Sequence, residues 1–171
     1  MSNLPVELMA SISQFRTTVT PGDAAAVEAI VRSAVVFSEE EIAIARELVE
    51  DNLTRGSIAS GYHFLFSDGV DGLDGYTAFG PIPGTDRRYE LYWIAVRKAA
   101  QRTKLAARLL KASEDEARQM GGVMMIAETS TRPDYAPAQK FYRAQSYALL
   151  ADIPDWHADG DGLAIFGRRL T

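Results

Sequence analysis

The stretch that decides the fold is RYELYWIAVRKAAQRTKLAARLL, which runs from Arg88 to Leu110. Residues 89–96 are aromatic and aliphatic, as expected of a buried strand. A short basic turn follows, and from Lys104 the apolar residues recur at helical spacing. The start of a helix presents free backbone N–H groups, which together with nearby cations bind phosphate. The stretch therefore predicts an anion site at a strand-to-helix turn.

This stretch is the first part of a predicted β-α-β unit. The helix is expected from Lys104 to Met120, and Gly121-Gly122 ends it. The apolar run 123–127 then predicts a central strand covered on both faces, and the crossover should be right-handed. We expect the inner stripe of the helix to be Ala106, Leu109, Leu110, Ser113, Ala117 and Met120, and its outer face to carry Lys111, Glu114, Asp115 and Arg118.

The remaining segments complete an α/β (α+β) fold with a mixed sheet and helices on both faces. Strands are predicted at 14–19, 62–66, 73–79, 147–153 and 163–169, after a loose lead-in over 1–13. Helices are predicted after the caps Thr20 and Ser38 and over 135–144, with Leu53 inward and Arg55-Gly56 ending the second helix. Residues 154–162 are expected to form a polar loop. The absence of a linker or repeat predicts one domain, 1–171.

The composition of the chain excludes several kinds of site and disfavours some classes of partner. The chain lacks cysteine, which excludes disulfides, thiolate metal sites and a cysteine nucleophile. We expect a cytoplasmic protein, because no signal peptide or membrane span is recognisable. The net charge of −5 disfavours a nucleic-acid partner. The cations gather locally and indicate a small anionic ligand; they are Arg87, Arg88, Arg97, Lys98, Arg102, Lys104 and Arg108.

No metal is expected, because the two histidines are distant and the aspartates lack ligand spacing. The run 68–72, DGVDG, is interpreted as a tight turn, since a calcium loop would need a closing glutamate. His63 is interpreted as an ordinary strand residue. For His157, packing within its loop is the preferred interpretation, and contact with a substrate is the second.

Two motifs in this order resemble the GNAT superfamily of acyl-CoA-dependent N-acetyltransferases, from about Phe15 to Leu170. QRTKLA at 101–106 stands where the family has Q/R-x-x-G-x-G/A. ETSTRPDYAPAQKFYRAQSYAL at 128–149 is similar to the family's A-x-x-F-Y-x-x-x-G-F segment, with Ala138, Phe141, Tyr142 and Tyr147 at matching places.

The resemblance implies a mostly antiparallel sheet that splays open beside strand 89–96. It also implies acetyl-CoA as acyl donor, a primary amine of a small molecule (amino acid or polyamine-like) as acceptor, and a homodimer, as in many family members. The residues that it implies for coenzyme binding are Ile94, Ala95, Val96, Arg97, Gln101, Arg102, Thr103, Lys104, Leu105, Ala106, Ala138 and Phe141.

The resemblance also implies catalytic roles. Tyr142 stands where many members keep the acid that protonates the departing thiolate, and Glu90 where some members carry the base. Both have structural alternatives: Tyr142 as a core residue, and Glu90 as a strand-end charge paired with Arg87 or Arg88. Glu90 is expected to share a face with Tyr92 and Ile94, and Glu128 is a second candidate base.

The sequence departs from the family at two glycines. Lys104 replaces a glycine that lets the backbone approach phosphate, and Ser146 replaces the glycine after the second motif. The alternative function is therefore a catalytically attenuated GNAT-fold module that binds acyl-CoA or a protein partner. The acidic character of residues 20–60 and 154–162 favours a cationic acceptor.

Overall fold

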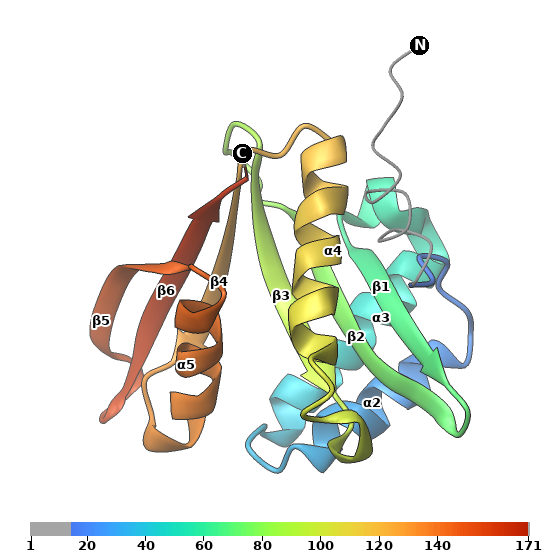
Figure 1. Cartoon of the computed structure of the whole chain (residues 1–171), viewed down its shortest axis with the longest axis horizontal. Helices are drawn as coiled ribbons and strands as arrows, with labels where there is room; N and C mark the ends of the chain where they lie inside the picture. Colours follow the sequence, from blue (N-terminus) through green and yellow to red (C-terminus); the bar gives the residue numbers. More distant parts are fainter. Residues whose placement is uncertain (1–14, 171) are drawn as a thin grey trace.

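The computed structural model describes residues 15–170. A six-stranded sheet has the order β1-β2-β3-β4-β6-β5, in which only the β3–β4 pair is parallel (Figure 1). This confirms the predicted mixed, mostly antiparallel α/β (α+β) fold. The strands are β1 (His63–Gly69), β2 (Gly72–Pro81), β3 (Arg88–Val96), β4 (Met124–Ser130), β5 (Ala148–Ala158) and β6 (Asp161–Arg169), and the helices are α2 (Asp23–Ser33), α3 (Glu39–Ser60), α4 (Leu105–Gln119) and α5 (Ala136–Ala144).

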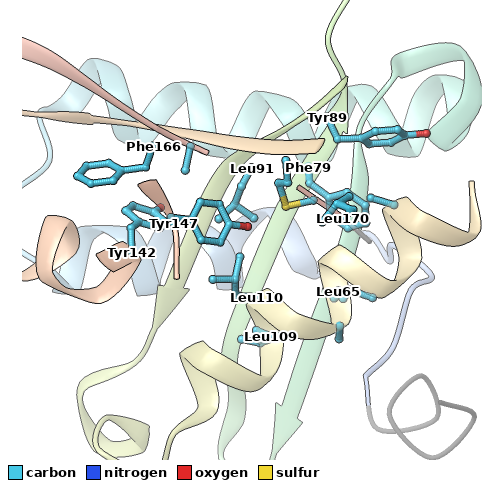
Figure 2. Packing of buried hydrophobic residues seen from close by; sticks show 14 of the residues in the cluster. Leu65, Phe79, Tyr89, Leu91, Leu109, Leu110, Tyr142, Tyr147, Phe166 and Leu170 are labelled. Carbon is cyan, nitrogen blue, oxygen red and sulfur yellow. The ribbon is translucent and has the colours of Figure 1, made fainter. Parts of the chain in front are cut away.

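Hydrophobic residues pack on both faces of the sheet. Under α4 and α5, Leu91 and Met125 from the central strands meet Leu109, Leu110 and the aromatic rings around Tyr142 (Figure 2). Under α2 and α3, Val27, Val31 and Val49 meet the other face of β1 and β2. The helices on both faces therefore hold the central strands β3 and β4 at the middle of the molecule.

The parallel pair β3–β4 is hydrogen-bonded over only half its length. Residues 88–91 pair with residues 124–127. Beyond that point β3 stays with β2 as far as Val96, whereas β4 stays with β6 as far as Ser130. The sheet therefore opens between the two strands, which separate toward the lower end in Figure 1.

A β-bulge at Tyr92 changes which residues of β3 share a face. Ala78 pairs with Trp93 and Phe79 with Leu91, so Tyr92 is an extra residue on β3. After the bulge, Ile94 and Val96 pack on the α4 side, and Trp93 and Ala95 on the α2–α3 side. The prediction that Glu90 and Ile94 share a face is wrong, because the bulge shifts the alternation by one residue.

Helix α4 also differs from its predicted pattern. Glu114 and Asp115, expected on the outer face, are each 2% exposed. Tyr147 donates a hydrogen bond to Glu114 at 3.0 Å, and Lys111 and Arg118 pair with Asp115 at 3.0 and 2.5 Å. These partners offset the cost of burying the two carboxylates. Met120, expected to face inward, is instead 38% exposed.

Several element boundaries shift. Predicted strand 14–19 is reduced to a bridge between Arg16 and Phe66, and residues 1–14 lie outside the described residues. The Ser38 capping box with Glu41 is confirmed, but α3 continues through a kink at Gly56 to Ser60, and Leu53 is 38% exposed.

The predicted cap of α2 is wrong, because Gly22 occupies that position and Asp23 instead accepts a hydrogen bond from the Thr20 backbone. The predicted loop 154–162 is largely strand, since β5 runs to Ala158 and β6 begins at Asp161.

Candidate active site

A cavity of about 870 Å³ opens where β3 and β4 separate. One wall is the end of β3 (92–96) and the opposite wall is the end of β4 (128–130). The α2–α3 connection and the start of α5 close the other sides. Of the residues predicted to bind the coenzyme or act in catalysis, the lining contains Ile94, Ala95, Val96, Gln101, Ala138 and Tyr142.

The other predicted site residues lie beside or behind this lining. Phe141 packs against the core under α4 and α5, and the Arg97 guanidinium is bound to Asp74 at 2.6 Å. Residues 102–106 form the turn and first residues of α4. Sequence reasoning therefore placed the strand, turn and helix correctly, but only six of the fourteen predicted site residues line the cavity itself.

The turn before α4 keeps the backbone conformation of a glycine-containing loop. Arg102 and Lys104 have φ of 64° and 60°, and Ser146, at the other missing glycine, has φ of 64°. Lys104 caps α4 without a side-chain hydrogen bond, and the first turn contains no acidic residue. The N–H groups of the first helical turn therefore have no intrahelical partner and are available to an anion.

Tyr142 lines the cavity. The ring is buried against Phe166, Tyr147 and Phe141, with centroid distances of 5.5 to 5.7 Å. Burial raises the pKa of the Tyr142 hydroxyl well above its usual value. Within residues 15–170 this hydroxyl has no hydrogen-bond partner, unlike that of Tyr147. A protonated phenol held at a cavity wall can donate a proton to a ligand.

Glu128 lines the cavity, whereas Glu90 is not part of the lining. Glu90 pairs in register with Ile126, two residues before Glu128, so the two carboxylates are on one face of the sheet. Burial and the charge of Glu128 raise the pKa of Glu90 to about 7. Arg87 and Arg88 contact Asp86 instead, and Glu90 has no ion pair among the described residues. A carboxyl group that titrates near neutral pH can serve as a general base.

Comparison with known proteins decides the family. The model of the acetyltransferase (GNAT) family matches residues 31–147. This chain belongs to the GNAT family. A Desulfovibrio desulfuricans structure assigned to the GNAT acetyltransferases is 37% identical with a TM-score of 0.89, and the match covers 92% of this chain and 98% of that one. No curated protein matches the chain.

More distant acetyltransferase structures share the fold. An aminoglycoside 6'-N-acetyltransferase complexed with coenzyme A is 14% identical with a TM-score of 0.73, over 92% of this chain and 97% of that one. The yncA protein of Salmonella typhimurium, solved with acetyl-CoA, is 22% identical with a TM-score of 0.68, over 92% and 93% of the two chains.

The two histidines of this GNAT protein differ in position. His63 stacks on Phe79 at 5.6 Å, outside the large cavity, and burial lowers its pKa. His157 lies on β5 and lines the cavity. Among residues 15–170 no three His, Asp or Glu side chains gather as a metal site. No helix in that range is both long and apolar enough to cross a membrane.

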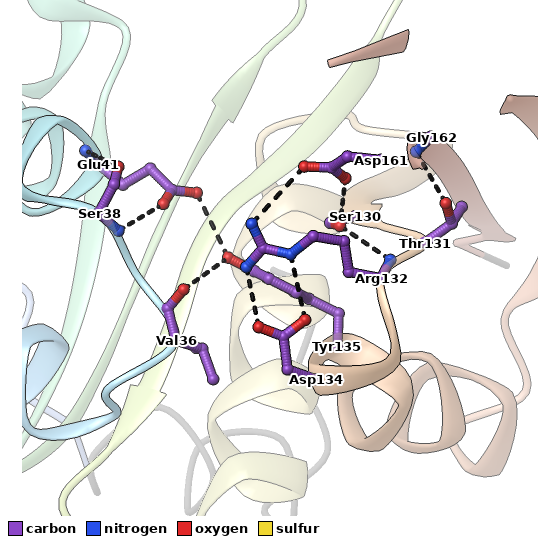
Figure 3. A network of polar contacts seen from close by, with 10 residues as sticks. All are labelled: Val36, Ser38, Glu41, Ser130, Thr131, Arg132, Asp134, Tyr135, Asp161 and Gly162. Carbon is purple, nitrogen blue, oxygen red and sulfur yellow. Dashed lines mark hydrogen bonds and ion pairs between the residues drawn. The ribbon is translucent and has the colours of Figure 1, made fainter. Parts of the chain in front are cut away.

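A polar network joins the two sides of the cavity (Figure 3). The Arg132 guanidinium contacts Asp134 at 2.8 Å and Asp161 at 3.7 Å. The Tyr135 hydroxyl reaches Glu41 Oε1 at 3.4 Å. Sequence reasoning missed these residues as a site, because they come from three separate segments. The signals it had were the place of Arg132, Asp134 and Tyr135 within the segment 128–149 and the acidic character of the stretches that contain Glu41 and Asp161.

Proposed function

We propose that this protein transfers the acetyl group of acetyl-CoA to a primary amine of a small molecule. The observation that carries the proposal is the cavity between β3 and β4, which is lined by Tyr142, a residue whose hydroxyl has no hydrogen-bond partner within residues 15–170. Beyond Leu91 no strand within residues 15–170 pairs with the β3 edge that faces the cavity, so its backbone groups are available to the amides of a pantetheine arm.

The coenzyme diphosphate would bind at the N-terminus of α4. The cations Arg102, Lys104 and Arg108 are exposed there. Arg97 is instead held by Asp74, since its guanidinium pairs with the Asp74 carboxylate and its backbone N–H donates to the Asp74 carbonyl. Gln101 and Ala138 would line the channel between the diphosphate and the reacting end. Coenzyme A or acetyl-CoA in two structures of the same fold supports this placement.

The chain's own groups supply the chemistry of direct attack. Glu90, acting through water, takes the proton of the amine as its nitrogen bonds to the thioester carbonyl carbon. A backbone N–H of β3 stabilises the oxyanion that forms. When the carbon–sulfur bond breaks, Tyr142 gives its proton to the thiolate and regains one from solvent.

The family match over 31–147 and the 92% coverage of this chain by the Desulfovibrio desulfuricans structure support a single acyltransferase domain over 1–171. Homodimerisation and a cytoplasmic location stay predictions. The same holds for the attenuated, non-catalytic alternative, which the following experiment separates from the enzyme.

Thermal unfolding with and without acetyl-CoA tests the proposal. We expect acetyl-CoA at about 1 mM to raise Tm by several degrees, because a ligand that binds only the folded state stabilises it. Release of free thiol with a panel of amines then measures turnover. An unchanged Tm rejects the proposal, and a raised Tm without thiol release from any amine favours the non-catalytic module.

A further prediction concerns Lys104. Because its side chain is exposed and outside the cavity, we expect it to attract the diphosphate and not to obstruct it. Lys104→Gln should weaken CoA binding about 3- to 10-fold in calorimetry at low salt, with the effect shrinking at high salt.

Lys104→Gly is the matched variant, since it loses the same charge and the Cβ. It should bind CoA as Lys104→Gln does but unfold at a higher temperature, because a left-handed non-glycine residue is strained by about 1 kcal/mol. CoA binding tighter than wild type in the glycine variant would show that the lysine obstructs the site.

A further inference from the structure

We propose that the acceptor is an organic diamine or polyamine, whose second ammonium group binds among carboxylates and aromatic rings while the first is acetylated. The inference rests on the proposed function and deepens it. It also decides between the amino-acid and polyamine-like acceptors that the sequence leaves open.

The charge of the cavity lining is the first observation. Five carboxylates line the cavity, against a single guanidinium within the described residues: Glu40, Glu41, Glu128, Asp134 and Asp161 against Arg132. Low-dielectric walls that carry one sign of charge attract ligands of the opposite sign. A cationic ligand is therefore favoured over a neutral or anionic one.

The state of Arg132 is the second observation. A substrate carboxylate would need a free cation, and Arg132 is the guanidinium in the described lining. Arg132 is held by Asp134 and Asp161 and stacks over the Tyr135 ring at 5.2 Å. An amino acid would have to displace these carboxylates while adding its own negative charge to the wall. The site therefore disfavours amino acids.

The aromatic residues of the wall are the third observation. Phe37 lies 5.0 Å from Trp93 and 6.1 Å from Tyr135, centroid to centroid, and all three line the cavity. Aromatic faces attract organic cations, most strongly when water is excluded. Beside them, Glu41 Oε2 accepts a hydrogen bond from the Ser38 backbone N–H. Among the described residues, Glu41 Oε1 has only the 3.4 Å contact with the Tyr135 hydroxyl.

The reacting end and the binding end lie on different elements. Tyr142 on α5, whose hydroxyl has no hydrogen-bond partner in the described part of the chain, marks the reacting end. Phe37 and Glu41 come from the α2–α3 connection and the start of α3, across the cavity from the Arg132 side, as Figure 3 shows for Glu41. A ligand that reaches both ends needs a chain between its two amino groups.

Three probes of similar length test the inference: cadaverine, pentylamine and δ-aminovalerate, which carry an ammonium, a methyl or a carboxylate at the far end. Calorimetry is run on the free and the CoA-loaded protein. We expect cadaverine to bind about tenfold more tightly than pentylamine, and δ-aminovalerate most weakly. Equal or tighter binding of either competitor, or no cadaverine binding at about 10 mM, overturns the inference. Failure of CoA itself to bind counts against the proposed function instead.

A charge-matched pair of variants locates the binding end. Glu40→Gln with Glu41→Gln removes two cavity charges and keeps the capping box, because glutamine also serves in it. Cadaverine should bind about tenfold more weakly to this double variant, and pentylamine unchanged. The control, Glu39→Gln with Glu47→Gln, removes two exposed charges of α3 outside the cavity and should bind both as wild type does. Equal cadaverine binding to the two double variants contradicts the inference.

Discussion

Tyr142→Phe is expected to lower kcat by about 10²- to 10⁴-fold, the usual contribution of general acid catalysis. The reason is that the variant loses only the proton that the departing thiolate needs. KM for acetyl-CoA should change little. Stability should also change little, because the hydroxyl has no partner among residues 15–170 and the ring keeps its packing against Phe166. Steady-state thiol release and thermal unfolding measure the two effects.

Tyr147→Phe is the matched control for this prediction. It removes the same atom from a ring 5.7 Å away, but that hydroxyl donates to the buried Glu114. The control should lower Tm, since a buried hydrogen bond to a carboxylate is lost, and leave kcat near wild type. Unchanged turnover in Tyr142→Phe, or an equal loss in both variants, would remove the acid role.

Glu90→Gln is expected to lower kcat/KM by about 10²- to 10³-fold at neutral pH and to abolish a pH dependence centred near neutrality. The wild-type carboxyl group titrates at about 7. Because only the ionised form accepts a proton, kcat/KM should rise as the pH increases through that value. Rates measured from about pH 5.5 to 8.5, with the amine concentration corrected for amine ionisation, test this rise, which we call the rising limb of the pH profile.

The neighbouring carboxylate provides the control. Glu128→Gln removes a like charge that raises the Glu90 pKa, so the rising limb should move to lower pH and not disappear. A Glu90→Gln profile that keeps the wild-type limb would contradict the base role of Glu90. A limb that does not move in Glu128→Gln would show that burial alone sets the pKa.

The raised pKa of Glu90 also predicts that stability depends on pH. Activity should increase as this carboxyl group ionises, whereas stability should decrease. The Glu90 pKa is raised in the folded protein, so its contribution to stability is greatest below the unfolded value of about 4.5 and is lost as pH rises through about 7. Glu90→Gln should therefore unfold at a higher temperature than wild type at about pH 8, with the difference vanishing near pH 4. Thermal unfolding at both pH values measures this.

Local patterns in the sequence predicted most of the elements. The apolar run before Val96, the helix after Lys104 and the capping box of Ser38 each depend on neighbouring residues, which act the same way in any fold. At the two positions where the family keeps glycine, Lys104 and Ser146 both have positive φ. The family itself could also be recognised, because its two motifs are contiguous.

Only the tertiary structure decided how these elements present their side chains. The bulge at Tyr92 depends on pairing with β2, and the burial of Glu114 depends on Tyr147 and Arg168, which are distant in sequence. The acidic lining of the cavity likewise combines Glu41 and Asp161, which are distant in sequence. Side-chain alternation and helical periodicity are local, whereas register, desolvation and charge pairing arise between segments. The sequence by itself therefore determined the family and the position of the strand-to-helix turn, and the packed structure decided the face of Glu90, its pKa and the charge of the cavity lining.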